Sequence, residues 1–497
     1  MKILLATGRK AEEMVKDAIA DLSDIDCTVL TQDLNIAAFS TPGSLKKALG
    51  TYSRDCDLIL VPGLCKSEFS GLEEQIATPI RLGPRNAYDL AEALKYVGKL
   101  EFSSRLPADV FLTAQRYENA HKELYKLESS VKETFKLKDV KIGGEVRMKV
   151  CAELVDATMM HERDLHRKID YYMKCGADIL DIGIHIGAKP AEVKRAVKTT
   201  RSYVPDIPVS VDTLDAELIL AGIESGADMV LSVNRANIAA VADAIAGNEI
   251  ATVVIPDSDS SIESLYANIN RAREEGIKRI IADPVLNAIG YGLAESLYNY
   301  YLFRLRDKNT PLFFGIGNIT ELIDADSPGV NATLAGIASD LNADILFTPE
   351  YSDKARGCVR ELRVASELMM LAKIRKSAPK DVGLNLLILK EKRRRPVIKA
   401  GNEGLIAASS DGKWQLDPKG SFRIGIIEVE DDKRLYAEHL PTGKRIAGRT
   451  AKAMMETIIR LGLVTLLEHV SYLSRELTKA ELALRLDRGY EQDEALF

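Results

Sequence analysis

Carboxylate and amide side chains stand where the apolar runs of this sequence end. The run VSVD ends at Asp212, and the apolar run after the next amphipathic segment ends at Asn234. Other runs end in the same way. The full set is Glu153, Asp156, Asp181, His185, Asp212, Asn234, Asp257, Asp283, Asn318 and Glu350. So many acids gathered in one place would repel one another, and the pattern therefore predicts a partner that offsets their charge.

A flat heterocycle with an aminopyrimidine edge is the partner that this chemistry favours. Its two adjacent N–H groups match a carboxylate, which accepts both in a fork. An asparagine adds a donor and an acceptor for the remaining ring atoms. Two alternatives stay open: an Asp can cap the following helix, for which SVDTLDAE is a good start, and a divalent metal can hold several acids. His and Cys do not cluster with these acids, which argues against a dedicated metal site.

The elements that must position these residues form a repeated strand-and-helix unit. Eight apolar runs lie between residues 146 and 378, and the segments between them mostly have a helical period. The runs are VRMKVCAELV, DILDIGI, IPVSVD, DMVLSV, ATVVIP, RIIAD, PLFFGI and DILFT. Eight units in about 230 residues is the size of a (β/α)8 barrel, whose active sites are built at the carboxyl ends of the strands. The tripeptides GAD at 176 and 226 and NAD at 342 mark helix ends that turn into strands.

Two further regions flank the barrel, so the predicted fold class is α/β with three domains. Residues 1–140 alternate strands and helices, which predicts a small doubly wound α/β domain of flavodoxin-like or Rossmann-like type, with a bridging helix over 106–138. Residues 141–380 form the TIM barrel. Residues 381–497 predict a C-terminal α+β module, with strands at LNLLILK, GLIAAS, SFRIGIIEVE and RLYAEHL and two helices after them.

The composition favours work on small molecules in the cytoplasm. A net charge of −6 over 497 residues gives no basic footprint for nucleic acid or a membrane surface. The six cysteines include no CxxC pair, which is typical of free thiols in a reducing compartment. MKILLATGRK reads as a strand and turn rather than a signal peptide, and no apolar stretch approaches the roughly 18 residues that span a bilayer. We expect a homo-oligomer, with amphipathic helices at 450–486 that could pair subunits.

Several of these segments together resemble one family. VSVDTLDAELILAGIESGADMVLSVN resembles the third and fourth strand units of the pterin-binding barrels, which are the dihydropteroate synthases and the methyltetrahydrofolate-dependent methyltransferases. GADILDIGIHIGAKP is similar to their second strand and loop, IIADPVLNAIGYG to the Asp-Pro segment after strand six, and PLFFGIGNITEL to strand seven. The whole architecture, with HLPTGKRIAGRTAKAM near its end, resembles the archaeal dihydropteroate synthase-like proteins, a group associated with tetrahydromethanopterin.

The resemblance implies roles for individual residues. Asp212 and Asp283 would hold the amino and ring N–H groups of a pterin, and further substrate contacts would come from Asn234, Asn318 and Asp181. Asp156 would match the Asn that helps the synthases bind magnesium, which makes Mg²⁺ the implied cofactor. Asp156 and Lys189 are the candidate catalytic residues. Lys189 could take the place of the Arg and Lys that the synthases carry and that are missing from the matching positions of this sequence.

Departures from the synthase pattern leave the reaction open. Leu231 and Ser232 stand where the synthases carry Asn-Asp, and Asn318 and Ile319 stand where they carry Arg-Lys. The leading hypothesis is a transferase that joins a dihydropterin methyl diphosphate to an arylamine, a ribofuranosyl-aminobenzene phosphate, in tetrahydromethanopterin biosynthesis. The alternatives are a methyl-tetrahydropterin methyltransferase that acts on a corrinoid partner, with Asn318 at the pterin N5, and a non-catalytic pterin-binding protein.

Overall fold

The computed structural model divides the chain into two compact units, residues 1–394 and 395–497. It describes every residue except 21, 23–24, 51–55, 258–260, 381, 390–404, 410–414, 430–431 and 497. Nothing is described of the side chains of residues 88 and 111. None of the helices that it describes is long and apolar enough to cross a membrane.

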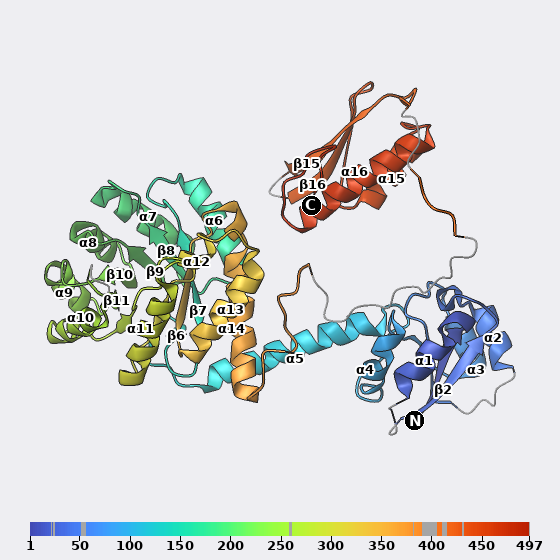
Figure 1. Ribbon diagram of the computed structural model, residues 1–497, viewed down its shortest axis with the longest axis horizontal. Coiled ribbons are helices and arrows are strands. Elements are labelled where there is room, and N and C mark those ends of the chain that lie inside the picture. Colours follow the sequence, from blue (N-terminus) through green and yellow to red (C-terminus); the bar gives the residue numbers. More distant parts are fainter. Residues whose placement is uncertain are drawn as a thin grey trace. The chain divides into compact units, whose positions relative to one another are not determined.

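The N-terminal part of the first unit is the predicted α/β domain, a parallel four-stranded sheet with helices on both faces (Figure 1). Along the first strand, Ile3 and Leu5 belong to one apolar cluster and Leu4 and Ala6 to another, so both faces of the sheet are buried. The strand order β2-β1-β3-β4 matches the start of the flavodoxin-like order. The elements are β1 (Lys2–Gly8), α1 (Glu12–Ile19), β2 (Asp26–Gln32), α2 (Pro42–Leu49), β3 (Leu58–Val61), α3 (Ser70–Ile76), β4 (Ile80–Leu82) and α4 (Leu90–Leu94).

Helix α5 (Ala108–Ser130) follows this domain, and its C-terminal half packs against the barrel. Glu128 of this helix pairs with Lys149 at the start of the first barrel strand, and Glu123 pairs with Arg375 at the end of the last barrel helix. These two ion pairs join the helix to the first strand and to the last helix of the barrel.

A β-hairpin, whose first strand falls within the predicted bridging helix, closes the amino-terminal end of the barrel. Its strands are β5 (Phe135–Leu137) and β6 (Val140–Ile142), so the helix predicted over 106–138 was wrong at its C-terminal end. Leu137 and Ile142 are buried in one cluster with the first inward-facing residues of the barrel strands. Strands of three residues carry too little periodicity to be recognised, and their place is set by this long-range packing.

The eight predicted strands form one parallel sheet, as a (β/α)8 barrel requires. The hydrogen-bonded order is β12-β11-β10-β9-β8-β7-β14-β13. An isolated parallel bridge between Ala282 and Leu312 joins the two edge strands and closes the barrel. The strands are β7 (Lys149–Leu154), β8 (Ile179–Gly183), β9 (Val209–Asp212), β10 (Met229–Val233), β11 (Ala251–Val254), β12 (Ile280–Ala282), β13 (Phe313–Phe314) and β14 (Ile345–Thr348).

Helices between the strands form the outer ring of the barrel (Figure 1). The helices that follow the first, second and fifth strands each bury one apolar face, and their polar faces meet solvent. The helices are α6 (Glu162–Cys175), α7 (Pro190–Tyr203), α8 (Ala216–Glu224), α9 (Ile238–Gly247), α10 (Ile262–Glu274), α11 (Leu293–Arg306), α12 (Gly317–Thr320), α13 (Ser327–Asp340) and α14 (Cys358–Arg375).

The aspartate of each GAD or NAD tripeptide fastens neighbouring barrel units at the starts of their strands. In each case a carboxylate oxygen accepts a hydrogen bond from the backbone N–H at the start of an adjacent strand. The bonds run from Val150 to Asp178 at 2.8 Å, from Val209 to Asp228 at 2.9 Å, and from Leu312 to Asp344 at 2.8 Å. The repeated tripeptide therefore contributes a long-range contact as well as the turn that the sequence predicts.

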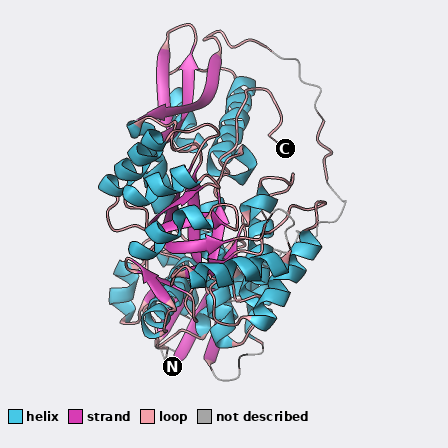
Figure 2. Ribbon diagram, turned by 90° about the vertical axis from the view of Figure 1, so that its left-hand side faces the viewer, coloured by secondary structure: helices cyan, strands magenta, loops and turns pink. Residues whose placement is uncertain are grey.

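The second unit is the predicted α+β module. Its antiparallel sheet consists of β15 (Phe422–Val429), β16 (Asp432–His439) and β17 (Lys444–Gly448), which lie side by side in Figure 2. Helices α15 (Ala451–Arg460) and α16 (Leu467–Arg485) cover one face. The described residues of LNLLILK and GLIAAS are not strands, so those two assignments were wrong, and β17 was missed. Residues 390 and 404 lie outside the described residues.

Candidate active site

Four carboxylates face the interior of the barrel at its carboxyl-terminal end. Side chains alternate along a strand, so Glu153 shares the inward face of Cys151, and Asp181 shares that of Ile179. By the same alternation Asp212 follows Ser210, and Asp283 follows the inward Ile281. The full inward set is Glu153, Asp181, Asp212 and Asp283. These side chains stand above the apolar layer that the hairpin closes from below.

Asp181 is fully buried in the middle of β8. The Ser210 hydroxyl donates to its Oδ1 at 2.6 Å, whereas its buried Oδ2 has no hydrogen-bond partner among the described residues. Burial raises the pKa of Asp181 well above its usual value, and the nearby charges of Asp212 and Glu153 raise it further. A buried oxygen of this kind calls for a proton or for a ligand N–H.

Asp212 ends β9 and does not cap the helix that follows. Asp215 is the cap of α8, and its Oδ1 accepts the N–H of Glu217 at 2.9 Å. This leaves the Asp212 carboxylate in the barrel, where the Ser232 hydroxyl donates to its Oδ1 at 2.6 Å. Burial raises the pKa of Asp212, and the bond from Ser232 opposes that rise.

Ser232 takes part in the site although it replaces a residue of the synthase pattern. Its backbone is left-handed, with φ of 65°, at an irregularity of the pairing between β10 and β11. This conformation, uncommon for a residue other than glycine, accompanies the turn of its hydroxyl toward Asp212. Leu231 beside it is buried in the apolar layer of the barrel interior. Of the two residues that depart from the synthase pattern here, Ser232 therefore still presents a polar group to Asp212, and Leu231 does not.

Asp283 is held by a tyrosine that the sequence analysis did not select. The hydroxyl of Tyr300, a fully buried residue of α11, lies 2.5 Å from Asp283 Oδ1 and 3.0 Å from the Phe313 carbonyl oxygen. The Val285 N–H also donates to Asp283 Oδ1, at 2.8 Å. Burial raises the pKa of Asp283 to about 6, and these two donors limit the rise.

Glu153 is the fourth inward acid, and no role followed for it from the resemblance. It lies against Gly183 of β8, where a Cβ atom would be 2.7 Å from Glu153 Oε1 and 2.9 Å from the Leu154 carbonyl oxygen, so a larger residue would crowd both this carboxylate and the backbone beside it. Burial raises the pKa of Glu153 to about 7, and the charges of Asp212, Asp156 and Glu321 add to the rise. Period-two alternation from Cys151 was the signal that could have selected it.

No cation offsets this charge among the residues that the structure describes. None of the four inward acids forms an ion pair with a Lys, Arg or His there, and the groups that shift their pKa values are carboxylates and hydroxyl or backbone donors. Buried acids without a cation are costly, and a ligand rich in N–H donors would satisfy them.

Tyr300 provides a test of how Asp283 is tuned. We expect Tyr300→Phe to raise the pKa of Asp283, because the carboxylate loses its closest donor. A ligand that needs the ionised acid should then bind roughly tenfold more weakly at pH 6 and recover much of that loss by pH 8. Calorimetric titration at both pH values measures this difference. An affinity loss that does not change with pH would contradict this tuning.

The remaining rim residues of the sequence analysis fall into an outer group with partners of their own. Asp257 pairs with Arg235 at 3.2 Å and accepts a hydrogen bond from Asn268. His185 Nδ1 lies 2.7 Å from the Thr158 hydroxyl. Glu350 accepts bonds from the Val359 N–H at 2.7 Å and the Tyr171 hydroxyl at 3.0 Å. Asp257, His185 and Glu350 thus each have a side-chain partner within the protein.

The two candidate asparagines differ in whether their side-chain oxygen already accepts a hydrogen bond. Asn234 uses its Oδ1 in a local turn, where it accepts the Ala236 N–H at 3.0 Å. Asn318 is exposed, and its Nδ2 donates to the Leu286 carbonyl at 2.8 Å, which leaves its Oδ1 for another partner. Asn318 is therefore better placed than Asn234 to meet a ligand with its oxygen.

The two candidate catalytic residues lie on exposed loops. Asp156 follows β7 in a left-handed conformation with φ of 52°, and its charge affects the pKa of Glu153. Lys189 precedes α7, and its backbone N–H donates to Glu192 at 2.7 Å. Among the described residues, no group of three or more His, Cys, Asp or Glu side chains is placed to hold a metal ion. A magnesium ion held by Asp156 would therefore need further ligands from water or from a substrate phosphate.

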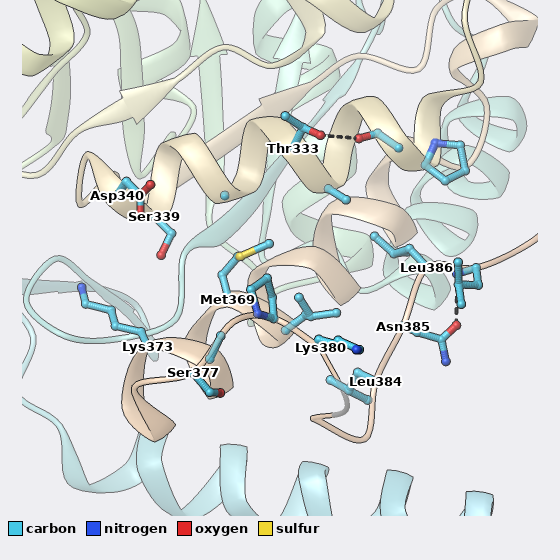
Figure 3. A pocket seen from close by; sticks show the side chains of 18 of the residues that line it. Thr333, Ser339, Asp340, Met369, Lys373, Ser377, Lys380, Leu384, Asn385 and Leu386 are labelled. Atoms are coloured by element: carbon cyan, nitrogen blue, oxygen red, sulfur yellow. Dashed lines mark hydrogen bonds between the residues drawn. The ribbon is translucent and has the colours of Figure 1, made fainter. Parts of the chain in front are cut away.

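A groove of about 1020 Å³ lies away from these acids, on the outside of the barrel (Figure 3). Thr333 and Ser339 of α13 and Met369 of α14 border it, and Leu384 and Leu386 face them from the segment that follows α14. Its lining is mainly apolar and small, and it holds no carboxylate cluster among the described residues. This groove therefore does not include the four inward acids.

Family models match three parts of the chain. Residues 159–315 match the model described as "Pterin binding enzyme", and residues 416–493 match "PterinBD-DUF4346". Residues 1–85 match a family of unknown function, DUF6513. The first match includes Asp181, Asp212 and Asp283 and ends before Asn318.

One curated relative matches from end to end. The uncharacterized protein MJ0107 of Methanocaldococcus jannaschii is 37% identical over 527 aligned residues, which cover 100% of this chain and 99% of that protein. Among solved structures, dihydropteroate synthase of Xanthomonas albilineans with 4-aminobenzoic acid is 20% identical, with a TM-score of 0.38, and the match covers 48% of this chain and 96% of that one. Dihydropteroate synthase of Coxiella burnetii with pteroic acid is 18% identical, with a TM-score of 0.36, and the match covers 45% and 92%.

Proposed function

We propose a reaction from the premise that this chain belongs to the pterin-binding enzyme family. The protein is a transferase of the dihydropteroate synthase type. It joins a dihydropterin methyl diphosphate to an arylamine and releases diphosphate. A ribofuranosyl-aminobenzene phosphate is the proposed arylamine, as tetrahydromethanopterin biosynthesis requires.

The observation that carries this proposal is the set of four inward acids with no cation among the described residues. A pterin has a 2-amino group and a ring N–H side by side, and a carboxylate accepts both in a fork. Asp212 and Asp283 would hold this edge, since each keeps an oxygen that none of the described residues contacts. Asp181 and the exposed Asn318 would complete the contacts with the ring.

The reaction follows from the charge of the site. The bond between the methylene carbon and the diphosphate oxygen breaks, and its electron pair leaves with the diphosphate. The pterin ring spreads the positive charge left on the methylene carbon, and the inward acids stabilise that charge electrostatically. The amine lone pair then forms the carbon–nitrogen bond, and the nitrogen loses a proton. The roles of Asp156 as a magnesium ligand and of Lys189 stay predictions, and no step here depends on them.

Release of diphosphate tests the proposal directly. Purified protein is mixed with the dihydropterin methyl diphosphate and the arylamine, and both diphosphate and the joined product are measured. We expect the two to appear in equal amounts. Release of neither, with magnesium present, would exclude the synthase reaction.

Methyl transfer is the second candidate, and the position of Asn318 supports it. Its exposed amide keeps a free Oδ1 while Leu286 holds its Nδ2, so it could accept a hydrogen bond from a protonated ring nitrogen. A methyltransferase would carry the methyl group of a methyl-tetrahydropterin to a corrinoid partner. Methyl transfer from methyl-tetrahydropterin to cobalamin by the purified protein would favour this reaction over the synthase.

A further inference from the structure

Glu153 is an inward acid that binding of the pterin edge does not require. Asp212 and Asp283 suffice for the fork to the amino and ring N–H groups. Glu153 has no hydrogen bond or ion pair to its carboxylate among the described residues, and Gly183 leaves the space in which that carboxylate lies. A largely buried carboxylate without a hydrogen-bond donor needs a proton or another partner.

Glu153 lies on β7, two strands from Asp212 of β9, and Asp181 of β8 is the strand partner between them. The charged groups that act on it are Asp212, Asp156 and Glu321, and it acts in turn on Asp181 of the adjacent strand. In the strand order, Asp283, directly after β12, and Glu153, on β7, lie on opposite sides of Asp212 on β9. A ring held between Asp212 and Asp283 by its amino edge carries its methylene group at the opposite end of the two-ring system. Asp181 and Glu153 are the inward acids on the side of Asp212 away from Asp283, where that end can lie, and of the two only Asp181 accepts a hydrogen bond, from Ser210.

We infer that Glu153 accepts the proton that the amine nitrogen loses when the carbon–nitrogen bond forms. This rests on the proposed function. The nitrogen lone pair forms the new bond to the methylene carbon, and the carbon–oxygen electron pair has left with the diphosphate. The electrons of the broken N–H bond stay on nitrogen, and the proton passes to a Glu153 oxygen. Glu153 later gives the proton to water, which restores the carboxylate.

The neighbours of Glu153 suit this role because they are all acids or neutral. Asp212, Asp156 and Glu321 disfavour its ionised form, and the Tyr172 hydroxyl bonds to the Glu153 backbone carbonyl, at 3.1 Å, and not to its carboxylate. The pKa of about 7 that results makes Glu153 a stronger base than an exposed glutamate. A base whose pKa lies near the working pH is the most effective in proton transfer.

The pH dependence of the reaction tests this role with Glu153→Gln. We expect the wild-type rate under saturating substrates to rise with pH and to level off above about 7, as the carboxylate ionises. Glu153→Gln should lower kcat by about 100-fold at pH 8 and remove the inflection, since proton transfer by a positioned group contributes at least that much. Its pterin affinity in calorimetry should stay within about threefold, because the edge contacts are intact. Glu162→Gln, an exposed acid on α6, is the matched control and should keep the wild-type profile.

Thermal unfolding shows whether the variant is folded and whether the acid is strained. Below about pH 4.5 the folded and unfolded states both bind the proton, and from there to about pH 7 only the folded state does. Ionisation of Glu153 therefore lowers the stability of the ligand-free protein as the pH rises through this window. Glu153→Gln should raise Tm at pH 8 by roughly 2–6 °C and leave it nearly unchanged at pH 4.

Each outcome decides one question. An active wild type with a Glu153→Gln variant that keeps both the rate and the inflection would overturn the role of Glu153 and leave the synthase reaction standing. A wild type that makes no product would overturn the synthase reaction and this role with it. A loss of kcat that keeps the inflection would mean that another base accepts the proton.

Discussion

Replacement of Asp212 by Asn should abolish tight binding of a pterin. The carboxylate accepts two N–H groups in a fork, whereas an amide presents one oxygen and a donor that faces the ligand's donors. Loss of charged hydrogen bonds and a donor placed against a donor together cost about 3 kcal/mol or more. We expect the Kd for a dihydropterin to rise by about 100-fold or more in calorimetric titration. This is a large effect from a change of one atom, because the site is buried and no described cation compensates.

Asp257 is the matched control for this substitution. It also follows a barrel strand, yet Arg235 and Asn268 already satisfy its carboxylate. Asp257→Asn should change the Kd by less than about threefold, as expected for a polar group outside the ligand contacts. If Asp212→Asn bound pterin as tightly as the wild type does, the inward acids would not form the pterin site. That result would favour the alternative of a non-catalytic protein.

The barrel strands could be predicted from the sequence because each is a continuous apolar run. A parallel strand buried on both faces needs such a run, and DILDIGI and DMVLSV meet that need without help from distant residues. The hairpin of β5 and β6 and the strand β17 could not be recognised in the same way. They are short, and packing against residues far away in the sequence decides their structure. LNLLILK is the reverse case. Its apolar run predicts a strand, but its described residues do not form one.

In the candidate site, too, some residues could be predicted from the sequence and others could not. The sequence places Asp212 and Asp283 at strand ends, and the structure finds both in the barrel interior. The sequence could not reveal the hydroxyl groups that adjust the pKa values of these two acids. Tyr300 lies 17 residues after Asp283, and Ser232 lies 20 residues after Asp212. Asn234 was selected by its position after an apolar run, but its side-chain oxygen serves a turn between adjacent residues. Strand alternation separates the inward acids from the outer ones better than position at the strand end does.

Two aspartates of the repeated GAD and NAD tripeptides should differ sharply in their effect on stability. Arg147 and Arg363 pair with Asp178 at 2.6 and 3.1 Å, and Val150 donates its N–H. Burial raises the pKa of Asp178, but the two arginines outweigh burial and leave it lowered. Removal of one partner from a buried ion pair costs about 3–5 kcal/mol, because the remaining charge loses its compensation. We expect Asp178→Asn to lower the free energy of unfolding by this amount at pH 7.

Asp344 has the same place in its unit and a weaker ion pair. Its single arginine, Arg304, lies 3.7 Å away, and burial raises the pKa of Asp344 to about 6. Ionisation of Asp344 is therefore costly in the folded state, and an asparagine oxygen can still accept the Leu312 N–H. We expect Asp344→Asn to cost about 1 kcal/mol or less in urea unfolding at pH 7.

The pH dependence of these two variants separates charge from hydrogen bonding. Because the pKa of Asp178 is lowered, its stabilisation is present above its unfolded pKa of about 4 and is lost as the pH falls through the folded value. The loss of free energy of unfolding in Asp178→Asn should therefore become smaller in acid. The free energy of unfolding of Asp344→Asn should instead increase relative to that of the wild type as the pH rises from about 4 to 6. Equal costs for the two variants at every pH would show that the backbone hydrogen bond, common to both aspartates, is what the repeated tripeptide contributes, and that the arginines add nothing.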